Sequence, residues 1–99
     1  MATKFRRASG NVFRDLGFSP VEAENLRIRS HLMARLKKLM MSEGLTQTKA
    51  ARLFGVSQPR VSDLVRGRIE LFSIDALVNM LAKAGVRVTV TARARRRAA

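Results

Sequence analysis

Apolar residues recur at a helical spacing from Pro20 to about Glu43, which predicts a long amphipathic helix. Ser19 can cap its first turn, and Glu22 stands three residues later, as in a capping box. Pro20 fits the first helical position, where its missing N–H would be unpaired in any case. The apolar stripe consists of Leu32, Leu36, Leu39 and Met40. Gly44 can adopt a left-handed conformation, so we expect the helix to end there.

Residues 45–67 read LTQTKAARLFGVSQPRVSDLVRG, a helical pattern that is interrupted in the middle. Thr46 is a candidate N-cap for a short helix that ends at Gly55. Ser57 can cap a second short helix with Pro59 in its first turn, where proline is compatible with a helix. The expected inward faces are Ala50, Ala51, Leu53 and Phe54 in the first helix and Val61, Leu64 and Val65 in the second.

The last third of the chain contains another helix and then a change of period. Ser73 can cap a helix that ends at Gly85, with Ile74, Leu77, Val78 and Leu81 on its apolar face. Beyond it, residues 86–92 alternate between Val or Ala and Arg or Thr, which predicts a strand. The strand needs a partner: either the segment NVF at residues 11–13 or the same strand of a second copy. We favour the second copy, with a dimer interface made of Val86, Val88 and Val90.

Two short helices joined by a glycine-containing turn form a helix-turn-helix, whose second helix enters the major groove of DNA. Counting from Gln47, the fifth residue, Ala51, is small enough for the helices to approach closely. The ninth, Gly55, can take a positive φ in the turn. Val61 and Leu64 stand where the second helix would be buried. The interruption therefore creates an angle, and the second half of the stretch is predicted to read DNA.

The exposed face of the second helix and the two helix N-termini supply the candidate DNA contacts. They are Thr46, Gln47, Ser57, Gln58, Pro59, Arg60, Ser62, Asp63, Arg66 and Arg68. Gln58 suits adenine and Arg60 suits guanine, whereas Ser62 can pair with either base. Asp63 could accept from cytosine, or it could instead orient one of the neighbouring arginines. Side chains at the helix N-termini are expected to lie near phosphates.

Length and charge set the scale of the molecule and the kind of partner. The chain has 99 residues, enough for one small domain. Its 20 Lys and Arg against seven Asp and Glu give a net charge of +13, which indicates a polyanionic partner. We expect a domain at residues 11–92, with the helix-turn-helix at 46–67, between flexible basic segments at 1–10 and 93–99. These segments either reach into the minor groove or act as solubilising tails.

The inventory of reactive side chains argues against an enzyme. The chain has no cysteine, no tyrosine and one histidine, His31, so we expect no disulfide, no metal site and no cofactor. It also lacks a clustered pair of carboxylates for acid–base catalysis. No apolar run approaches the roughly 18 residues of a membrane span. These features predict a cytoplasmic, nucleoid-associated protein without a membrane partner.

Residues 45–67 resemble the Xre/Cro-type helix-turn-helix family. The flanking sequences NVFRDLGFSPVEAENLRIRSHLM and LFSIDALVNMLAKAGVRVTV extend the similarity over residues 11–90, which resemble the HigA-like antitoxin subgroup. The resemblance implies a mainly α, four- to five-helix, lambda-repressor-like DNA-binding domain with one C-terminal β-strand. By the family pattern, Gln47 would contact phosphate, and the residues facing bases would be Gln58, Arg60, Ser62 and Asp63. Pro59 departs from the pattern, because it replaces a side chain that often contacts DNA.

Three functions are compatible with these features. A sequence-specific transcriptional repressor would bind a palindromic operator in double-stranded DNA as a homodimer, with half-sites about 34–36 Å apart. The resemblance adds a possible antitoxin role, in which the protein binds a RelE/HigB-like toxin and represses its own operon. The alternative is a non-specific, nucleoid-type nucleic-acid-binding protein. RNA is the least suitable ligand, because the chain has five Phe but no Trp or Tyr for base stacking.

Overall fold

A computed structural model of the protein describes residues 10–94, and most of the two predicted basic segments, 1–10 and 93–99, lies outside them. The described chain is helical, as predicted. Its elements are α1 (Val12–Asp15), α2 (Pro20–Ser42), α3 (Gln47–Phe54), α4 (Gln58–Val65), the short 3-10 helix η1 (Ile69–Leu71) and α5 (Ile74–Lys83).

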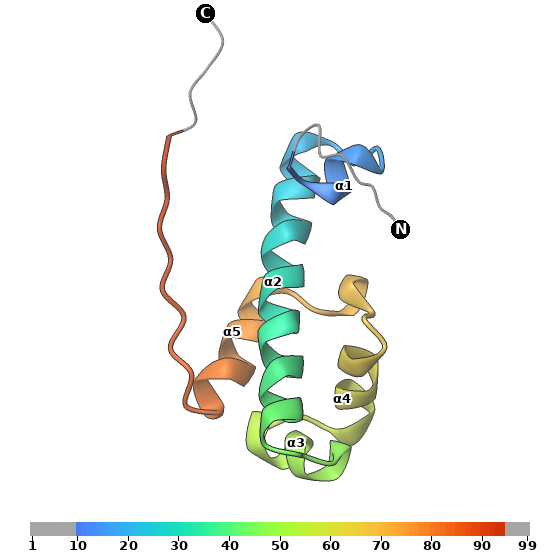
Figure 1. The fold of residues 1–99 in the computed structure, drawn as a ribbon, viewed down its shortest axis with the longest axis vertical. Coiled ribbons are helices and arrows are strands. Elements are labelled where there is room, and N and C mark those ends of the chain that lie inside the picture. The colour runs from blue at the N-terminus through green and yellow to red at the C-terminus, as the bar shows by residue number, and fades with distance from the viewer. Residues whose placement is uncertain (1–9, 95–99) are drawn as a thin grey trace, which may run out of the picture.

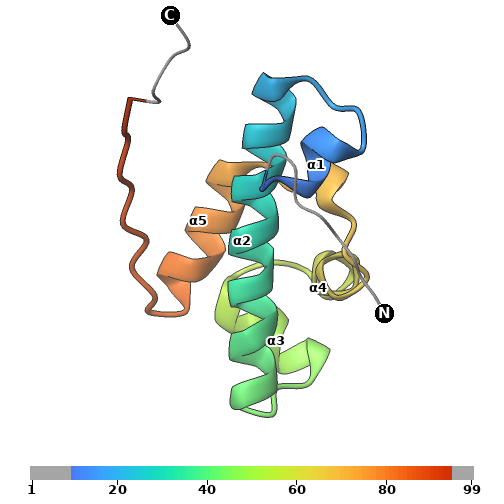
Figure 2. The same ribbon diagram turned by 45° about the horizontal axis from the view of Figure 1, so that its top comes forward.

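The long helix α2 is the central element around which the others pack (Figure 1). Helices α4 and α5 lie on opposite sides of it in both views (Figures 1 and 2). Helix α3 contacts both α4 and α5 and closes one end of the molecule. Helix α1 packs against α2 at the other end. Helices α1 and α3 are therefore at opposite ends of α2 (Figure 1).

The four helix N-caps predicted from the sequence are confirmed. The hydroxyl groups of Ser19, Thr46, Ser57 and Ser73 accept hydrogen bonds from the backbone N–H groups of Glu22, Lys49, Arg60 and Ala76 at 3.1, 3.1, 3.4 and 3.0 Å. For Glu22, Lys49 and Ala76 the bond satisfies a donor that the first helical turn would otherwise leave unpaired, whereas the N–H of Arg60 also donates to the Ser57 carbonyl. A cap of this kind contributes about 0.5–2 kcal/mol. Local sequence thus sets where α2, α3, α4 and α5 begin.

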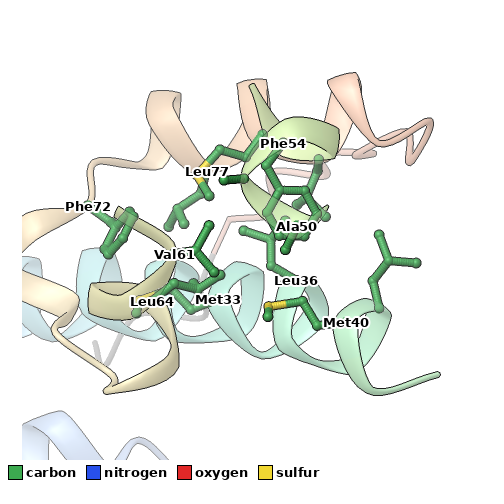
Figure 3. Close-up of a cluster of buried hydrophobic side chains, with 13 residues drawn as sticks. Met33, Leu36, Met40, Ala50, Phe54, Val61, Leu64, Phe72 and Leu77 are labelled. Atoms are coloured by element: carbon green, nitrogen blue, oxygen red, sulfur yellow. The ribbon is translucent and has the colours of Figure 1, made fainter. Parts of the chain in front are cut away.

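One hydrophobic core holds the longer helices together. Its largest fully buried side chains are Phe54, Phe72, Leu36, Leu64, Leu77, Met80, Leu81 and Val61. Figure 3 shows Leu36 of α2, Phe54 of α3 and Val61 of α4 within the same cluster. Val65 was expected on the inward face but is 43% exposed. It is the last residue of α4 and lines a surface hollow with Met41 and Leu45.

The strand predicted at residues 86–92 is not seen in the structure, in which residues 86–94 form no strand. The segment leaves α5 as extended chain and runs back toward the N-terminal end of α2 (Figure 1). Val86 and Val88 pack partly against the core, whereas Val90 is 83% exposed. A strand requires a second strand to pair its backbone groups, and this part of the chain offers none.

The segment NVF, considered above as a partner strand, is the start of helix α1 instead. The Asn11 side chain accepts hydrogen bonds from Phe13 N at 2.9 Å and Arg14 N at 3.4 Å, which caps the helix. The same side chain donates to the carbonyl oxygen of Ala23 at 3.2 Å and so ties α1 to α2. The contact with α2, which lies 12 residues away, explains why a four-residue helix is ordered here.

Gly55 and Gly44 provide a matched test of the turn that separates α3 from α4. Both have a positive φ, +71° and +59°, so alanine should cost about 1–2 kcal/mol of stability at either position. A Cβ atom at Gly44 would meet open space, whereas one at Gly55 would collide with the side-chain carbons of Lys83. The colliding atoms are the far end of the exposed, flexible Lys83 side chain, which can move aside. We therefore expect Gly55→Ala and Gly44→Ala to lose similar amounts of stability in thermal unfolding, with Lys83→Ala leaving both losses unchanged. A larger loss for Gly55→Ala that Lys83→Ala removes would show that Lys83 constrains the turn.

Candidate nucleic-acid interface

The two short helices α3 and α4 meet at a tight turn. Gly55 has the left-handed conformation expected of it, with φ at +71°. The N–H of the next residue, Val56, donates to the carbonyl oxygen of Ala51 at 3.0 Å. Ser57 then returns the chain to an extended conformation and caps α4. The glycine and the serine thus redirect the chain within three residues.

Helix α4 is anchored through one apolar face. Val61 and Leu64 are fully buried, and Ala51 of α3 is 8% exposed. These residues occupy the positions that the sequence assigned to the contact between the two helices. Because α4 has only eight residues, burying this face leaves the opposite side of the helix directed outward.

The ten predicted DNA-contact residues lie on α3, on α4 and in the turns that flank them. The exposed ones are Thr46, Ser57, Gln58, Pro59, Arg66 and Arg68. Those of intermediate exposure are Gln47, Arg60, Ser62 and Asp63. Thr46 and Ser57 already use their hydroxyl oxygens as helix caps. Their phosphate contacts would therefore have to involve the hydroxyl hydrogens or the backbone N–H groups.

Arg60 has partners within the protein. Its Nη1 donates to the carbonyl oxygen of Leu71 at 2.9 Å. Its guanidinium carbon lies 4.1 Å from the centre of the Phe72 ring, within range of a cation–π interaction. The side chain thus spans from α4 to the loop before α5, whereas the sequence suggested that it faces a guanine.

Arg68 is paired with an acidic side chain. Its Nε donates to Oε2 of Glu70 at 3.0 Å, and both side chains are about half exposed. A backbone hydrogen bond of Glu70, followed by the bond from Arg68, lowers the pKa of the Glu70 carboxyl from its ordinary value. The carboxylate therefore stays charged as the pH falls until that lower pKa is reached. At neutral pH, binding of Arg68 to a phosphate would compete with this ion pair.

Asp63 forms no ion pair with Arg60 or Arg66 in the part of the chain that the structure describes. The structure gives Arg60 other partners, which leaves the Asp63 carboxylate at intermediate exposure on α4. Of the two readings that the sequence left open, this arrangement offers no support for a structural ion pair with the neighbouring arginines.

Three residues near this interface were not identified from the sequence. Arg29 of α2 donates to the carbonyl oxygens of Ile69 at 3.2 Å and Phe72 at 3.4 Å. Phe72 provides the aromatic ring for Arg60. Lys83 of α5 lies against Gly55 in the turn. For Phe72, the sequence offers one signal: Leu71 and Phe72 form an apolar pair in the link between two predicted helices. For Arg29 and Lys83 the sequence offers none, because their contacts join distant parts of the chain.

No group of three or more His, Cys, Asp or Glu side chains within residues 10–94 is placed to hold a metal ion. None of the helices in that range is both long and apolar enough to cross a bilayer. The candidate functional side chains that were predicted from the sequence lie together in the structure on α3, α4 and the flanking turns.

The angled pair α3–α4, with one buried and one outward face on α4, defines a helix-turn-helix domain. The chain belongs to the helix-turn-helix domain family, whose profile matches residues 12–93. It is similar to a solved structure described as "Putative XRE Family Transcriptional Regulator", with 30% sequence identity and a TM-score of 0.71. The alignment covers 79% of this chain and 91% of that chain. No curated protein sequence matches.

Proposed function

We propose that the protein is a sequence-specific DNA-binding transcriptional regulator that acts as a repressor. The observation that carries this proposal is the outward polar face of α4, held in place by the fully buried Val61 and Leu64 on its other side. The family membership and the similarity to an XRE-type regulator support it. The net charge of +13 supplies the attraction to a polyanion that such a role needs.

Helix α4 has suitable dimensions and chemistry to enter the major groove. An α-helix with its side chains is about 10–12 Å in diameter, and the major groove is about 12 Å wide. Gln58, exposed in the first turn, would pair with a base edge, most suitably adenine. The exposed Lys49, Arg52 and Arg66 would contact phosphates on either side and fix the position of the helix.

Binding to the DNA upstream of its own gene, compared with a scrambled duplex of equal length, tests this function. We expect the upstream DNA to bind at least about 10³-fold more tightly at physiological salt, because base contacts add to the phosphate contacts. The measurement is a fluorescence-anisotropy titration repeated from about 50 to 300 mM salt. Equal affinities that collapse together as salt rises would instead support a non-specific nucleic-acid-binding protein.

Two variants of α4 sharpen this experiment. Gln58→Ala should cost about 1–3 kcal/mol on the upstream DNA and relax the preference at one base pair. Arg66→Ala, at the C-terminal cap of the same helix, is the matched control. It should weaken binding to both duplexes and reduce the salt slope by about one, as expected of a phosphate contact.

We further infer that the regulator is a homodimer on a palindromic operator, joined through residues 86–92. Along this extended segment, Val or Ala alternates with Arg or Thr. Within the described chain the segment pairs with no strand. Val90 is 83% exposed, whereas Val86 and Val88 of the same alternating set are partly buried. Antiparallel pairing with the same segment of a second copy would satisfy the backbone groups and cover Val90, together with the partly buried Val86 and Val88.

Val90→Asp should weaken the dimer at least about tenfold, because it would place an unpaired charge in the interface. Met41→Asp is the control, since Met41 is also 83% exposed but lies at the far end of α2. Neither change removes a buried contact, so both variants should melt like the unmodified monomer. Sedimentation equilibrium with and without upstream DNA gives the dimer affinity. A monomer at high micromolar concentration, even with DNA present, would rule the dimer out.

An antitoxin role is a second candidate, supported by the end of the molecule that carries α1. Four large apolar side chains are exposed there: Val12 (57%), Leu16 (69%), Phe18 (44%) and Val21 (82%). Residues 11–26 contain three acidic residues and one basic residue, Arg14, in contrast with the basic chain as a whole. The next basic residue, Arg27, is paired with Glu24. Exposed apolar patches often bind proteins, and the local acidity suits a basic partner such as a RelE/HigB-like toxin.

Co-expression with the protein encoded by the adjacent gene tests the antitoxin role. The unmodified chain should co-purify with that protein and relieve any growth arrest it causes. Val21→Lys should abolish both effects, because it places a positive charge in the apolar patch, where it would repel a basic partner, without disturbing the core. Met41→Lys, at an equally exposed apolar position on the same helix, should retain them. Failure of the unmodified chain to bind or neutralise its neighbour would remove this role.

A further inference from the structure

The side chain of Arg60 points from α4 to the loop before α5, where it has two partners. Nη1 donates to the carbonyl oxygen of Leu71 at 2.9 Å, and the guanidinium carbon lies 4.1 Å from the centre of the Phe72 ring. We propose that Arg60 is a positioning residue, which fixes the orientation of α4 in the DNA groove through Leu71 and Phe72 and reads no base itself. This inference rests on the proposed DNA-binding function.

The loop that receives Arg60 is itself fixed to the body of the protein. Arg29 of α2 donates to the carbonyl oxygens of Ile69 and Phe72 from the other side, and its Nε donates to Asn25 Oδ1 at 2.7 Å. The Phe72 side chain is 1% exposed and belongs to the core. Arg60 is therefore attached to a segment whose neighbouring carbonyl groups are bonded to α2 and whose Phe72 ring lies in the core.

The buried face of α4 leaves one motion that Arg60 would restrain. Val61 and Leu64 are fully buried and lie three residues apart, nearly one turn, on the same face of the helix. Two anchors on one line fix the position of a short helix, but the helix can still rock about that line. Arg60 reaches sideways from this line to Leu71 and so supplies a third point of attachment.

A bidentate base contact would compete with both partners of Arg60 for the same guanidinium group. The hydrogen bond to Leu71 involves a charged donor, and such bonds are among the stronger ones in proteins. Phe72 cannot follow the guanidinium outward, because its ring is buried in the core. Gln58, by contrast, is exposed and has no side-chain hydrogen bond within the described chain, so it can meet a base at no such cost.

The test uses the tightest duplex that the unmodified chain selects from a random library, together with every single-base-pair variant of it. The proteins are Arg60→Ala, Phe72→Leu, the double variant and Arg66→Ala as control. We expect Arg60→Ala to weaken binding to all these duplexes by one common factor, with base preferences and salt slope unchanged. The double variant should have about the same DNA affinity as whichever single variant binds DNA less tightly. Its loss of affinity would then be smaller, by about fivefold or more, than the product of the two single losses.

Two other patterns would overturn the positioning role. Loss of preference at a single base pair, by about 5- to 150-fold, with additive effects of the two changes, would make Arg60 a base-reading residue. A salt slope reduced by about one for every duplex, as expected for Arg66→Ala, would make it a phosphate contact. Thermal unfolding of each variant corrects the affinities for any loss of folded protein.

The NMR resonance of the Arg60 side-chain Hε provides a readout that needs no substitution. The Phe72 ring should shift it in the free protein, and the shift should persist when the selected duplex binds. A resonance that moves to a DNA-contact position on binding would contradict the positioning role. If the library yields no preferred sequence, the proposed regulator function fails, while the shift in the free protein still reports whether Arg60 is held by Phe72.

Discussion

The burial of one face of α4 is the contact on which the proposed DNA-reading surface depends. A helix of eight residues is marginal in water by itself, so α4 needs the core to be stable. Fully buried Val61 and Leu64 provide that contact, and the Ser57 cap begins the helix. The same burial leaves the opposite face outward. Stability and the presentation of polar side chains to a ligand are thus consequences of one packing event.

Charge and exposed apolar side chains are distributed unevenly over the surface of the molecule. The end that carries α3 and α4 presents exposed lysines and arginines, as attraction to phosphates requires. The end that carries α1 presents exposed apolar side chains beside acidic residues. This surface and the outward face of α4 consist of different residues, which is compatible with simultaneous binding of DNA and of a protein.

The sequence was most informative where structure depends on a few consecutive residues. A Ser or Thr three residues before an N–H donor forms a cap wherever the helix begins, and all four such caps were predicted correctly. The strand at 86–92 was wrong for the described chain because pairing depends on a distant partner. Helix α1 was missed for the same reason, because it depends on the distant contact between Asn11 and Ala23 of α2. The sequence showed only Asn11, which caps the helix.

The sequence by itself determined the helix-turn-helix: its caps, its glycine turn and the apolar face of α4 are all encoded within residues 45–67. The polar character of the outward face follows from the same pattern. Only the tertiary structure decided how Arg60 is used. Its partners are Leu71, 11 residues away, and Phe72, whose carbonyl is held by Arg29 from 43 residues earlier. Such contacts arise when the core brings distant segments together, and no local pattern encodes them.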